Sequence, residues 1–331
     1  MTAVQNRRRP GTGAPLGLRA GDRVRLRDWR EIAATLDEDG RTDGLPFMAE
    51  LLPLAGQTLA VASRADKTCD TVTMSGTTRA MDDTVHLAEV RCDGSAHGGC
   101  QAGCLLYLRE QWLERVLPGE TPPRREPVPA ELTERLARYA DAGPGHHRCQ
   151  ATQALEASRP LTGVGHYVTD LRTHNVPLSR WAAGVWWALV NRYQSASWHL
   201  PAFLRFRGGH RLPDLSGPAG EGRWPAASSP DLARGDLVEV RSLAEIRATL
   251  DADQRNRGLR FDEEMARLCG RRGRVLYRVE RLIDERTGRM LRITKDLYVV
   301  AGMTGCEGVY HRLCTRQVIA MFRGSWLRRI G

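Results

Sequence analysis

The fold is decided by the stretch GDRVRLRDWREIAATLD, residues 21–37, because it occurs a second time as GDLVEVRSLAEIRATLD, residues 235–251. The likeness continues outward at a constant offset. Residues 21–116 align with residues 235–330 without a gap, and roughly thirty of the paired positions are identical. An internal match of this length predicts two related domains of about a hundred residues each, which is a normal domain size.

Each copy has the same predicted layout of a strand, two short helices and further strands. The first helix starts at Asp28 in one copy and at Ser242 in the other, and each is followed three residues later by a glutamate, the spacing of a capping box. A turn at Thr287-Gly288 predicts a hairpin in the second copy. Short strands with two helices predict an α+β fold with two homologous, small, SH3-like or partly open β-barrel units. The Gly-Asp-x-Val opening is similar to the start of SH3-like barrels.

Changes in composition divide the rest of the chain. We predict a flexible N-terminal tail at 1–20, repeat domain 1 at 21–117, a middle segment at 118–232 and repeat domain 2 at 233–331. Within the middle segment, the sequence predicts helices near 129–141, 148–158 and 177–194, between a Pro-rich linker (118–129) and a Gly/Pro/Ser-rich linker (207–232). The last helix carries Trp181, Val185, Trp186 and Leu189 at helical spacing, which predicts a core or docking helix, or alternatively an aromatic surface for a partner.

The composition excludes wholesale disorder and a membrane-spanning helix. Hydrophobic residues make up 41% of the 331 residues and charged residues 27%, as in ordinary globular chains, and no run of about 18 apolar residues occurs. The net charge is +10, but it comes from arginines dispersed along the chain, which disfavours a specific nucleic-acid partner. No apolar segment of a secretion signal follows Arg7–Arg9, so we expect a cytoplasmic protein whose cysteines are thiols or metal ligands.

The chemistry is concentrated in CDGSAHGGCQAGC, residues 92–104, which places Cys92, His97, Cys100 and Cys104 within thirteen residues. The glycines between them let a short loop curl so that several side chains converge. Thiolates with an imidazole suit zinc or an iron–sulfur cluster rather than magnesium or calcium. We predict a metal site here, with Cys69 as a further thiolate and with His97 either as a ligand or as a hydrogen-bonding neighbour of the ligands.

The second copy repeats this pattern in reduced form. Cys306, His311 and Cys314 align with Cys92, His97 and Cys100, whereas Ile283 and Val318 stand in the positions of Cys69 and Cys104. We therefore expect a complete site in the first copy. The second site is either degenerate or completed from elsewhere, by Cys149 of the middle segment or by Cys269. We interpret Cys269 as a small hydrophobic residue.

Three functional hypotheses follow from these residues. The first is a duplicated metal-binding protein, an accessory protein or a metalloenzyme in a bacterial biosynthetic pathway, with a small-molecule or protein partner. The alternative is a tandem SH3-like interaction module with structural zinc that binds a protein or nucleic acid. In a third, redox hypothesis, Cys100 and Cys104 exchange as a thiol pair. No standard catalytic motif appears, so enzymatic activity stays open. Glu50 and Glu264, at equivalent positions, are interpreted as surface carboxylates.

The motif at 92–104, the stretch from Arg64 to Asp70 and the second motif at 306–314 together resemble a family of bacterial proteins with a repeated Cys/His-rich motif. The resemblance covers most of the chain. Members of that family accompany natural-product or polysaccharide biosynthesis genes, which implies an accessory role in biosynthesis. The resemblance implies no particular reaction and no catalytic residues.

Overall fold

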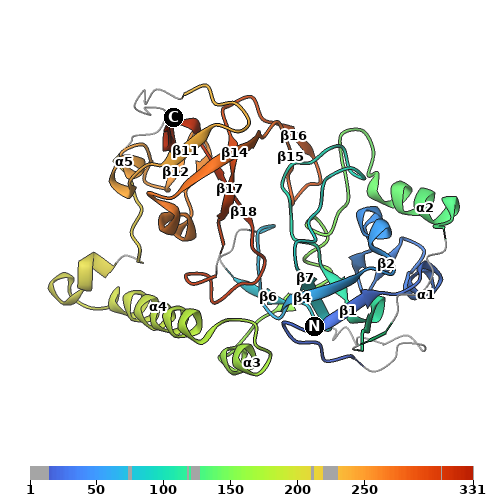
Figure 1. Cartoon of the computed structure of the whole chain (residues 1–331). Helices are drawn as coiled ribbons and strands as arrows, with labels where there is room; N and C mark the ends of the chain where they lie inside the picture. The colour runs from blue at the N-terminus through green and yellow to red at the C-terminus, as the bar shows by residue number, and fades with distance from the viewer. Residues whose placement is uncertain are drawn as a thin grey trace.

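The computed structural model describes residues 15–73, 77–117, 119–120, 127–209, 212–218, 230–306 and 308–330. Helices and strands are mixed, and most strands belong to two five-stranded antiparallel sheets. The two sheets lie side by side, with α3 and α4 along one side of the molecule (Figure 1). The predicted mixture of helices and strands is therefore confirmed.

The two large sheets have the same strand order. The first sheet runs β8-β7-β4-β1-β9 and the second runs β18-β17-β14-β11-β19. The first consists of β1 (Arg23–Leu26), β4 (Thr58–Arg64), β7 (Thr84–Leu87), β8 (Leu108–Arg109) and β9 (Leu113–Arg115). The second consists of β11 (Leu237–Val240), β14 (Arg272–Arg278), β17 (Tyr298–Thr304), β18 (Ile319–Phe322) and β19 (Leu327–Arg329). Each strand of the second sheet overlaps or directly adjoins the position that the sequence alignment assigns to its counterpart.

Smaller strand pairs surround these sheets. One pair is β2 (Arg41–Thr42) with β3 (Leu45–Pro46), and its counterpart is β12 (Arg255–Asn256) with β13 (Leu259–Arg260). A three-stranded sheet contains β5 (Thr68–Cys69), β6 (Thr78–Ala80) and β10 (Arg159–Pro160). The predicted hairpin around Gly288 is formed by β15 (Arg281–Ile283) and β16 (Met290–Arg292).

The first helix of each half begins at a capping box, as the spacing predicts. Before α1 (Trp29–Thr35), Asp28 and Glu31 exchange side-chain and backbone hydrogen bonds, and Ser242 and Glu245 do the same before α5 (Leu243–Arg247). The second predicted helix of each half is a 3-10 helix, η1 (Ala49–Leu54) or η5 (Glu263–Leu268). Two more 3-10 turns, η2 (Glu110–Trp112) and η6 (Gly324–Trp326), precede the last strands.

A buried tryptophan occupies the core of each half. Trp112 meets Phe47 edge-on at a ring-centroid distance of 5.1 Å, and Trp326 meets Phe261 at 5.2 Å. Each indole N–H also donates to a threonine hydroxyl at 3.0 Å, from Trp112 to Thr42 and from Trp326 to Thr249. The tryptophan–phenylalanine contact is therefore the same in both cores, whereas the two threonines come from different positions of the repeat, since Thr249 aligns with Thr35.

The helices of the middle segment differ in position from those predicted. It contains α2 (Ala130–Ala140), α3 (His166–Arg172), α4 (Leu178–Ser197), η3 (Ala202–Leu204) and η4 (Phe206–Gly209). Helix α3 was not predicted, and the helix predicted at 148–158 is wrong, because residues 150–157 form successive turns. Gln150 explains the difference: its side chain accepts the Tyr107 N–H and donates to the carbonyls of Tyr107 and Pro46, which ties this segment to the first half.

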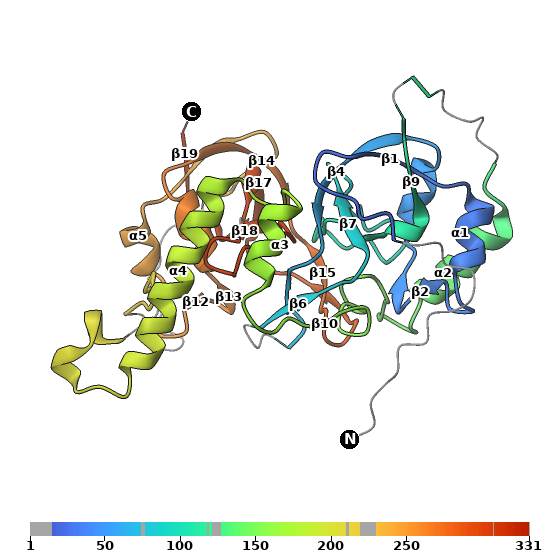
Figure 2. The same ribbon diagram turned by 90° about the horizontal axis from the view of Figure 1, so that it is seen from below.

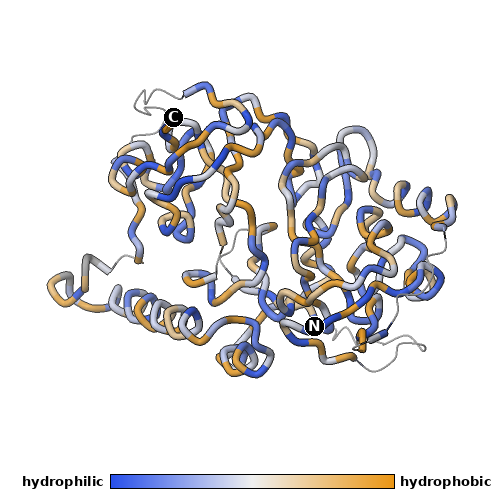
Figure 3. Tube along the Cα trace, in the orientation of Figure 1, coloured by the Kyte–Doolittle hydropathy of each residue, from blue (hydrophilic) through white to orange (hydrophobic). Residues whose placement is uncertain are grey.

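The apolar face predicted for helix α4 is only partly buried. Trp186 is 63% exposed and Leu189 59%, and hydrophobic residues recur along the helix (Figure 3). Its inner face contacts the second half through Gly184, which lies against Leu313, and through Trp187, whose ring is 5.2 Å from that of Tyr310. The core prediction is therefore wrong for Trp186 and Leu189. In the part of the chain that is described, no helix has the length and apolar character needed to cross a membrane.

The N-terminal segment is ordered where the structure describes it. Residues 1–14 of the predicted tail lie outside the described residues, as do most of the Pro-rich linker (118 and 121–126) and much of the second linker (219–229). Leu18 is fully buried, and the N–H groups of Gly17 and Leu18 donate to the Glu110 carboxylate at 2.8 and 3.1 Å. The tail prediction is wrong for this stretch because Leu18 belongs to the first core.

The two halves interlock by exchanging contacts between their Cys/His loops and their hairpins. From loop 92–104 of the first half, the Gln101 N–H donates to the Arg281 carbonyl of β15 at 3.0 Å. Just after the second motif, the Thr315 N–H donates to the Lys67 carbonyl beside β5 at 3.2 Å. Strand β15 lies between the halves when the molecule is seen from below (Figure 2). Because β5 and β15 occupy equivalent positions, each loop contacts the equivalent hairpin of the other half.

Candidate metal sites

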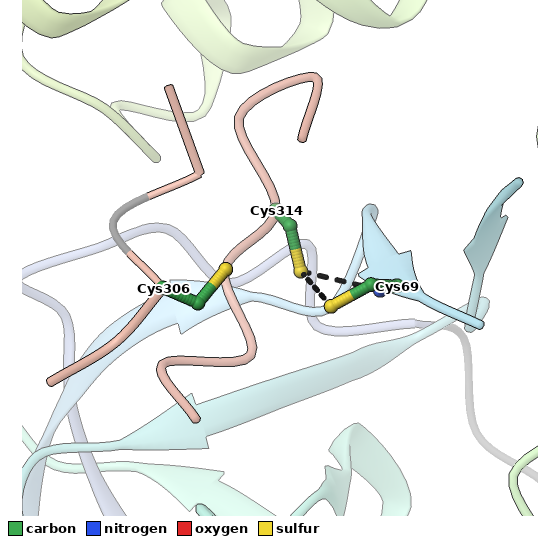
Figure 4. Close-up of side chains that lie close together, drawn as sticks. All are labelled: Cys69, Cys306 and Cys314. Carbon is green, nitrogen blue, oxygen red and sulfur yellow. Dashed lines mark hydrogen bonds between the residues drawn. The ribbon is translucent and has the colours of Figure 1, made fainter. Parts of the chain in front are cut away.

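Three cysteine sulfurs converge where the second loop meets the first half. The Sγ atoms of Cys69, Cys306 and Cys314 all lie within 4.8 Å of one another, and those of Cys69 and Cys314 are 3.0 Å apart. Figure 4 shows the three side chains pointing toward one another, Cys69 from β5 and the other two from the loop after β17. We call this group the junction site.

The spacing of the junction site suits a single ion. With Zn–S bonds of about 2.3 Å, two sulfurs on one tetrahedral ion lie about 3.8 Å apart, which is less than the 4.8 Å limit within which all three sulfurs lie. Among the described residues, no fourth histidine, cysteine or carboxylate joins the group. Three cysteine sulfurs are therefore available to a metal.

The junction site changes the predicted partner of Cys69. We expected Cys69 to complete the first Cys/His loop, but it lies with the second. The reason is the exchange between halves: β5 packs on the second loop, so a side chain on β5 faces Cys306 and Cys314 across the junction. The equivalent position on β15 is Ile283, which accordingly faces the first loop.

Hydrogen bonds make Cys314 the acidic thiol of the junction site. Bonds from the Cys306 and Cys69 thiols lower the pKa of Cys314, and the N–H groups of Cys69 and Arg316 point at its sulfur at 3.2 and 3.5 Å. The bond to Cys314 raises the pKa of Cys306. One stabilised thiolate beside two thiols is an arrangement that a cation completes by displacing protons.

His311 lies outside the junction site. Its Nε2 atom is 3.0 Å from the nearer carboxylate oxygen of Asp262, and Glu263 lies 4.0 Å away. Although burial opposes the charged imidazole, the hydrogen bond and charge of Asp262 raise the pKa of His311 to about 9. The structure thus brings His311 to two carboxylates, a third group with metal-binding atoms within 4.8 Å, and not to the cysteines of its own motif.

The first loop, residues 92–104, lines a separate pocket together with the middle segment. Cys92, Cys100, Cys104 and Cys149 all border it, and so do Ile283 and Arg316. We call it the four-cysteine pocket. Cys149 was predicted as a donor for the second copy, but the structure places it with the first, because Gln150 ties its segment to Tyr107.

The four-cysteine pocket is a low-dielectric environment. Burial raises the pKa of Cys104 to about 12 and that of Cys149 to about 11, and burial also raises the pKa of Cys92. These thiols also interact electrostatically with one another, Cys92 with Cys104 and Cys149, and Cys100 with Cys104 and Cys149. Thiols of this kind ionise only when a cation compensates the charge.

His97 lies beside one ligand candidate of the pocket. Its Nε2 atom is 3.3 Å from the Cys92 sulfur and its Nδ1 atom is 3.2 Å from Glu50 Oε1. The imidazole is buried. Glu50, Cys92 and His97 form the remaining group with ligand atoms within 4.8 Å, so His97 suits either predicted role, ligand or hydrogen-bonding neighbour.

A glycine shapes each loop. Gly94 and Gly308 have φ angles of +77° and +76°. A Cβ atom at Gly94 would lie 2.1 Å from the Cys100 carbonyl oxygen, and one at Gly308 would lie 2.4 Å from that of Cys314. Both glycines therefore allow the close backbone approach that turns two cysteines toward one side of the loop.

The interpretation of Glu50 and Glu264 as surface carboxylates is wrong, because both side chains are buried beneath the loops. The Glu50 carboxylate accepts the Ala96 N–H at 3.4 Å, and that of Glu264 accepts the Tyr310 N–H at 2.5 Å. Burial opposes ionisation of both. The neighbouring His97 and backbone N–H groups still lower the pKa of Glu50, whereas burial raises the pKa of Glu264 to about 7. The equivalent positions of the glutamates were the sequence signal for this shared role.

A buried ion pair beside the junction site was not predicted from the sequence. Lys67, two residues before Cys69, is fully buried and pairs with Asp170 of α3, and its Nζ atom lies 4.4 Å from the ring centroid of Tyr167. Burial lowers the pKa of Lys67 and raises that of Asp170 to about 6. The pair holds α3 against the first half; the rarity of lysine in this chain was its only signal.

Comparisons with known proteins give no further identification: the chain matches no protein-family model, no curated protein and no solved structure.

Proposed function

We propose that this chain is a metal-binding protein in which a zinc ion at the junction site joins the two halves. The observation that carries the proposal is the convergence of three sulfurs within 4.8 Å, one from the first half and two from the second. Thiolates prefer soft or borderline ions such as zinc. A bound ion would stabilise the interface directly, since binding energy at such a site is also folding energy.

The same proposal gives the zinc a free fourth position. Catalytic zinc sites keep three protein ligands and one place for water or substrate. In the proposal, a small-molecule ligand of the zinc would occupy this fourth position, which agrees with a metalloenzyme or an accessory protein of a biosynthetic pathway. The biosynthetic assignment rests on the family resemblance alone.

We also propose that the two halves are homologous SH3-like units. Two kinds of similarity support this view: the identical strand order and the repeated contacts of single residues. Arg109 donates to the carbonyls of Thr42, Asp82 and Asp43, and Arg323 donates to the carbonyls at the three equivalent positions, Asn256, Asp296 and Arg257. Separate origins would not be expected to reproduce such a network.

Metal analysis tests the proposed function. We expect about one zinc per chain in protein purified anaerobically without chelators, and loss of most of that zinc in Cys69→Ser and in Cys306→Ser. Cys269→Ser is the matched control, because Cys269 packs beside the second core and outside both cysteine groups. Less than about a tenth of an equivalent of any transition metal in the unaltered chain would refute the proposal.

A further inference from the structure

The four-cysteine pocket has a different geometry from the junction site. Its cysteines border one pocket and interact electrostatically, yet among the described residues no three of them bring their sulfurs within 4.8 Å of one another. Sulfurs that share one ion must lie closer than that. In an iron–sulfur cubane each cysteine binds a different iron, so four sulfurs surround a larger object and lie farther apart.

We propose that the four-cysteine pocket holds a cubane iron–sulfur cluster, with Cys92, Cys100, Cys104 and Cys149 as its ligands. The inference deepens the proposed function by naming a second, different metal group, and it does not require zinc at the junction site. Three ligands come from the loop at 92–104 and the fourth from the middle segment. The cluster would thereby fix the middle segment to the first half.

The walls of the pocket suit such a group. Met48, Leu105 and Ala151 line it with apolar surface, which limits access of water to a cluster. Arg316, which is 3% exposed, also lines the pocket and pairs with Glu285 at 2.9 Å. Glu285 lines the pocket as well, so this ion pair adds little net charge to its wall.

The surroundings of the ligands are also defined. The Cys92 N–H donates to the Cys104 carbonyl at 2.8 Å, which closes the loop at its base. At the other end, the Gln150 side chain holds the Cys149 segment by its bonds to the Tyr107 backbone, at 2.8 Å each. His97 lies 3.3 Å from the Cys92 sulfur, where a ring N–H would donate to a bound thiolate.

The second half lacks this set of ligands. Val318 stands in the position of Cys104, and the second loop has Cys69 rather than a counterpart of Cys149 beside it. The same loop scaffold therefore borders a pocket with four cysteines in one half and contributes to three close sulfurs in the other. Arg316 contacts both places, since its N–H points at Cys314 and its side chain lines the four-cysteine pocket.

One rival arrangement uses part of the same residues. Glu50, Cys92 and His97 lie close enough for a single ion, and that ion would not need Cys149. Cys149→Ser and Glu50→Gln therefore separate the two arrangements. The cluster depends on the first residue and the single ion depends on the second.

The experiment measures iron, acid-labile sulfide and zinc in the same anaerobically purified samples of the full chain, after reconstitution with iron and sulfide. We expect about four iron and four sulfide ions per chain and a brown protein. Cys149→Ser and Cys104→Ser should lose half or more of the iron and change the visible spectrum, while Cys269→Ser and Glu50→Gln keep the iron. Circular dichroism of each variant reports whether it folds.

Two results would overturn the cluster. One is reconstituted, folded protein without iron and sulfide. The other is Cys149→Ser with the iron content of the unaltered chain, above all if Glu50→Gln loses its metal. The two proposals fail separately: Cys306→Ser should lose zinc and keep iron, and Cys149→Ser should lose iron and keep zinc.

Discussion

The two Cys/His loops have similar backbone turns and differ mainly in the residues that other parts of the chain place beside them. Both turn at a glycine that approaches a cysteine carbonyl, and both cover a buried glutamate. The first loop receives Cys149 from the middle segment and faces Ile283, whereas the second receives Cys69 across the junction. The loop sequence is thus repeated, whereas residues distant in sequence decide which cysteines lie beside each copy.

The largest effect should come from the glycines that shape the loops. Gly94→Ala and Gly308→Ala should each lower the free energy of unfolding by on the order of 3 kcal/mol or more, because the new Cβ overlaps a carbonyl oxygen and φ is positive. Gly258→Ala is the matched control, with a φ of +86° but open space around the Cβ, and should cost about 1 kcal/mol. Urea unfolding measures all three. If Gly94→Ala and Gly258→Ala lowered the free energy of unfolding by the same amount, the first loop would not be held in this conformation.

The two buried glutamates should respond to substitution with opposite signs at pH 8. A folded-state pKa raised to about 7 means that the Glu264 carboxyl contributes stability below pH 4.5 and loses it as the pH rises through 7. Glu264→Gln should therefore stabilise the chain at pH 8 by about 1–3 kcal/mol. The pKa of Glu50 is lowered, so its stabilisation is present above pH 4.5 and lost as the pH falls through the folded-state pKa.

Glu50→Gln should accordingly destabilise the chain at pH 8 and differ less from the unaltered chain in acid. Urea unfolding at pH 4.5 and pH 8 checks both variants. If both substitutions changed the free energy of unfolding in the same direction at pH 8, the contact with His97 would not lower the pKa of Glu50 as the structure indicates.

The smallest effect concerns the backbone of the second loop. Gly98 and Gly99 of the first loop have positive φ, and so do Arg312 and Leu313 at the equivalent positions. A left-handed leucine is strained, but Leu313 is fully buried against Gly184 of α4. Leu313→Gly should therefore be more stable than Leu313→Ala by about 1 kcal/mol, the reverse of the usual order.

Leu327 is the control for that measurement, since it is equally buried but has a φ of −112°. Thermal unfolding of Leu327→Gly and Leu327→Ala should show the usual order, with alanine more stable. The usual order at both sites would mean that Leu313 is not held in the left-handed region.

The sequence by itself determined the local structure of each half. The ungapped repeat predicted the positions of the first strands, the capping boxes at Asp28 and Ser242 and the hairpin around Gly288, because these features depend on residues a few positions apart. It also located the two glycine-containing loops that carry most of the cysteines. Side-chain periodicity and turn chemistry are sufficient for such short-range features.

Only the tertiary structure decided which cysteines meet. Cys69 and Cys314 are 245 residues apart in the chain, and nothing in their local sequences shows that β5 packs on the loop of the other half. The same holds for Cys149, placed by the bonds of Gln150, and for Glu50 and Glu264, whose burial depends on the loops above them. A metal site requires side chains to converge in space, and convergence depends on long-range packing that local sequence patterns do not encode.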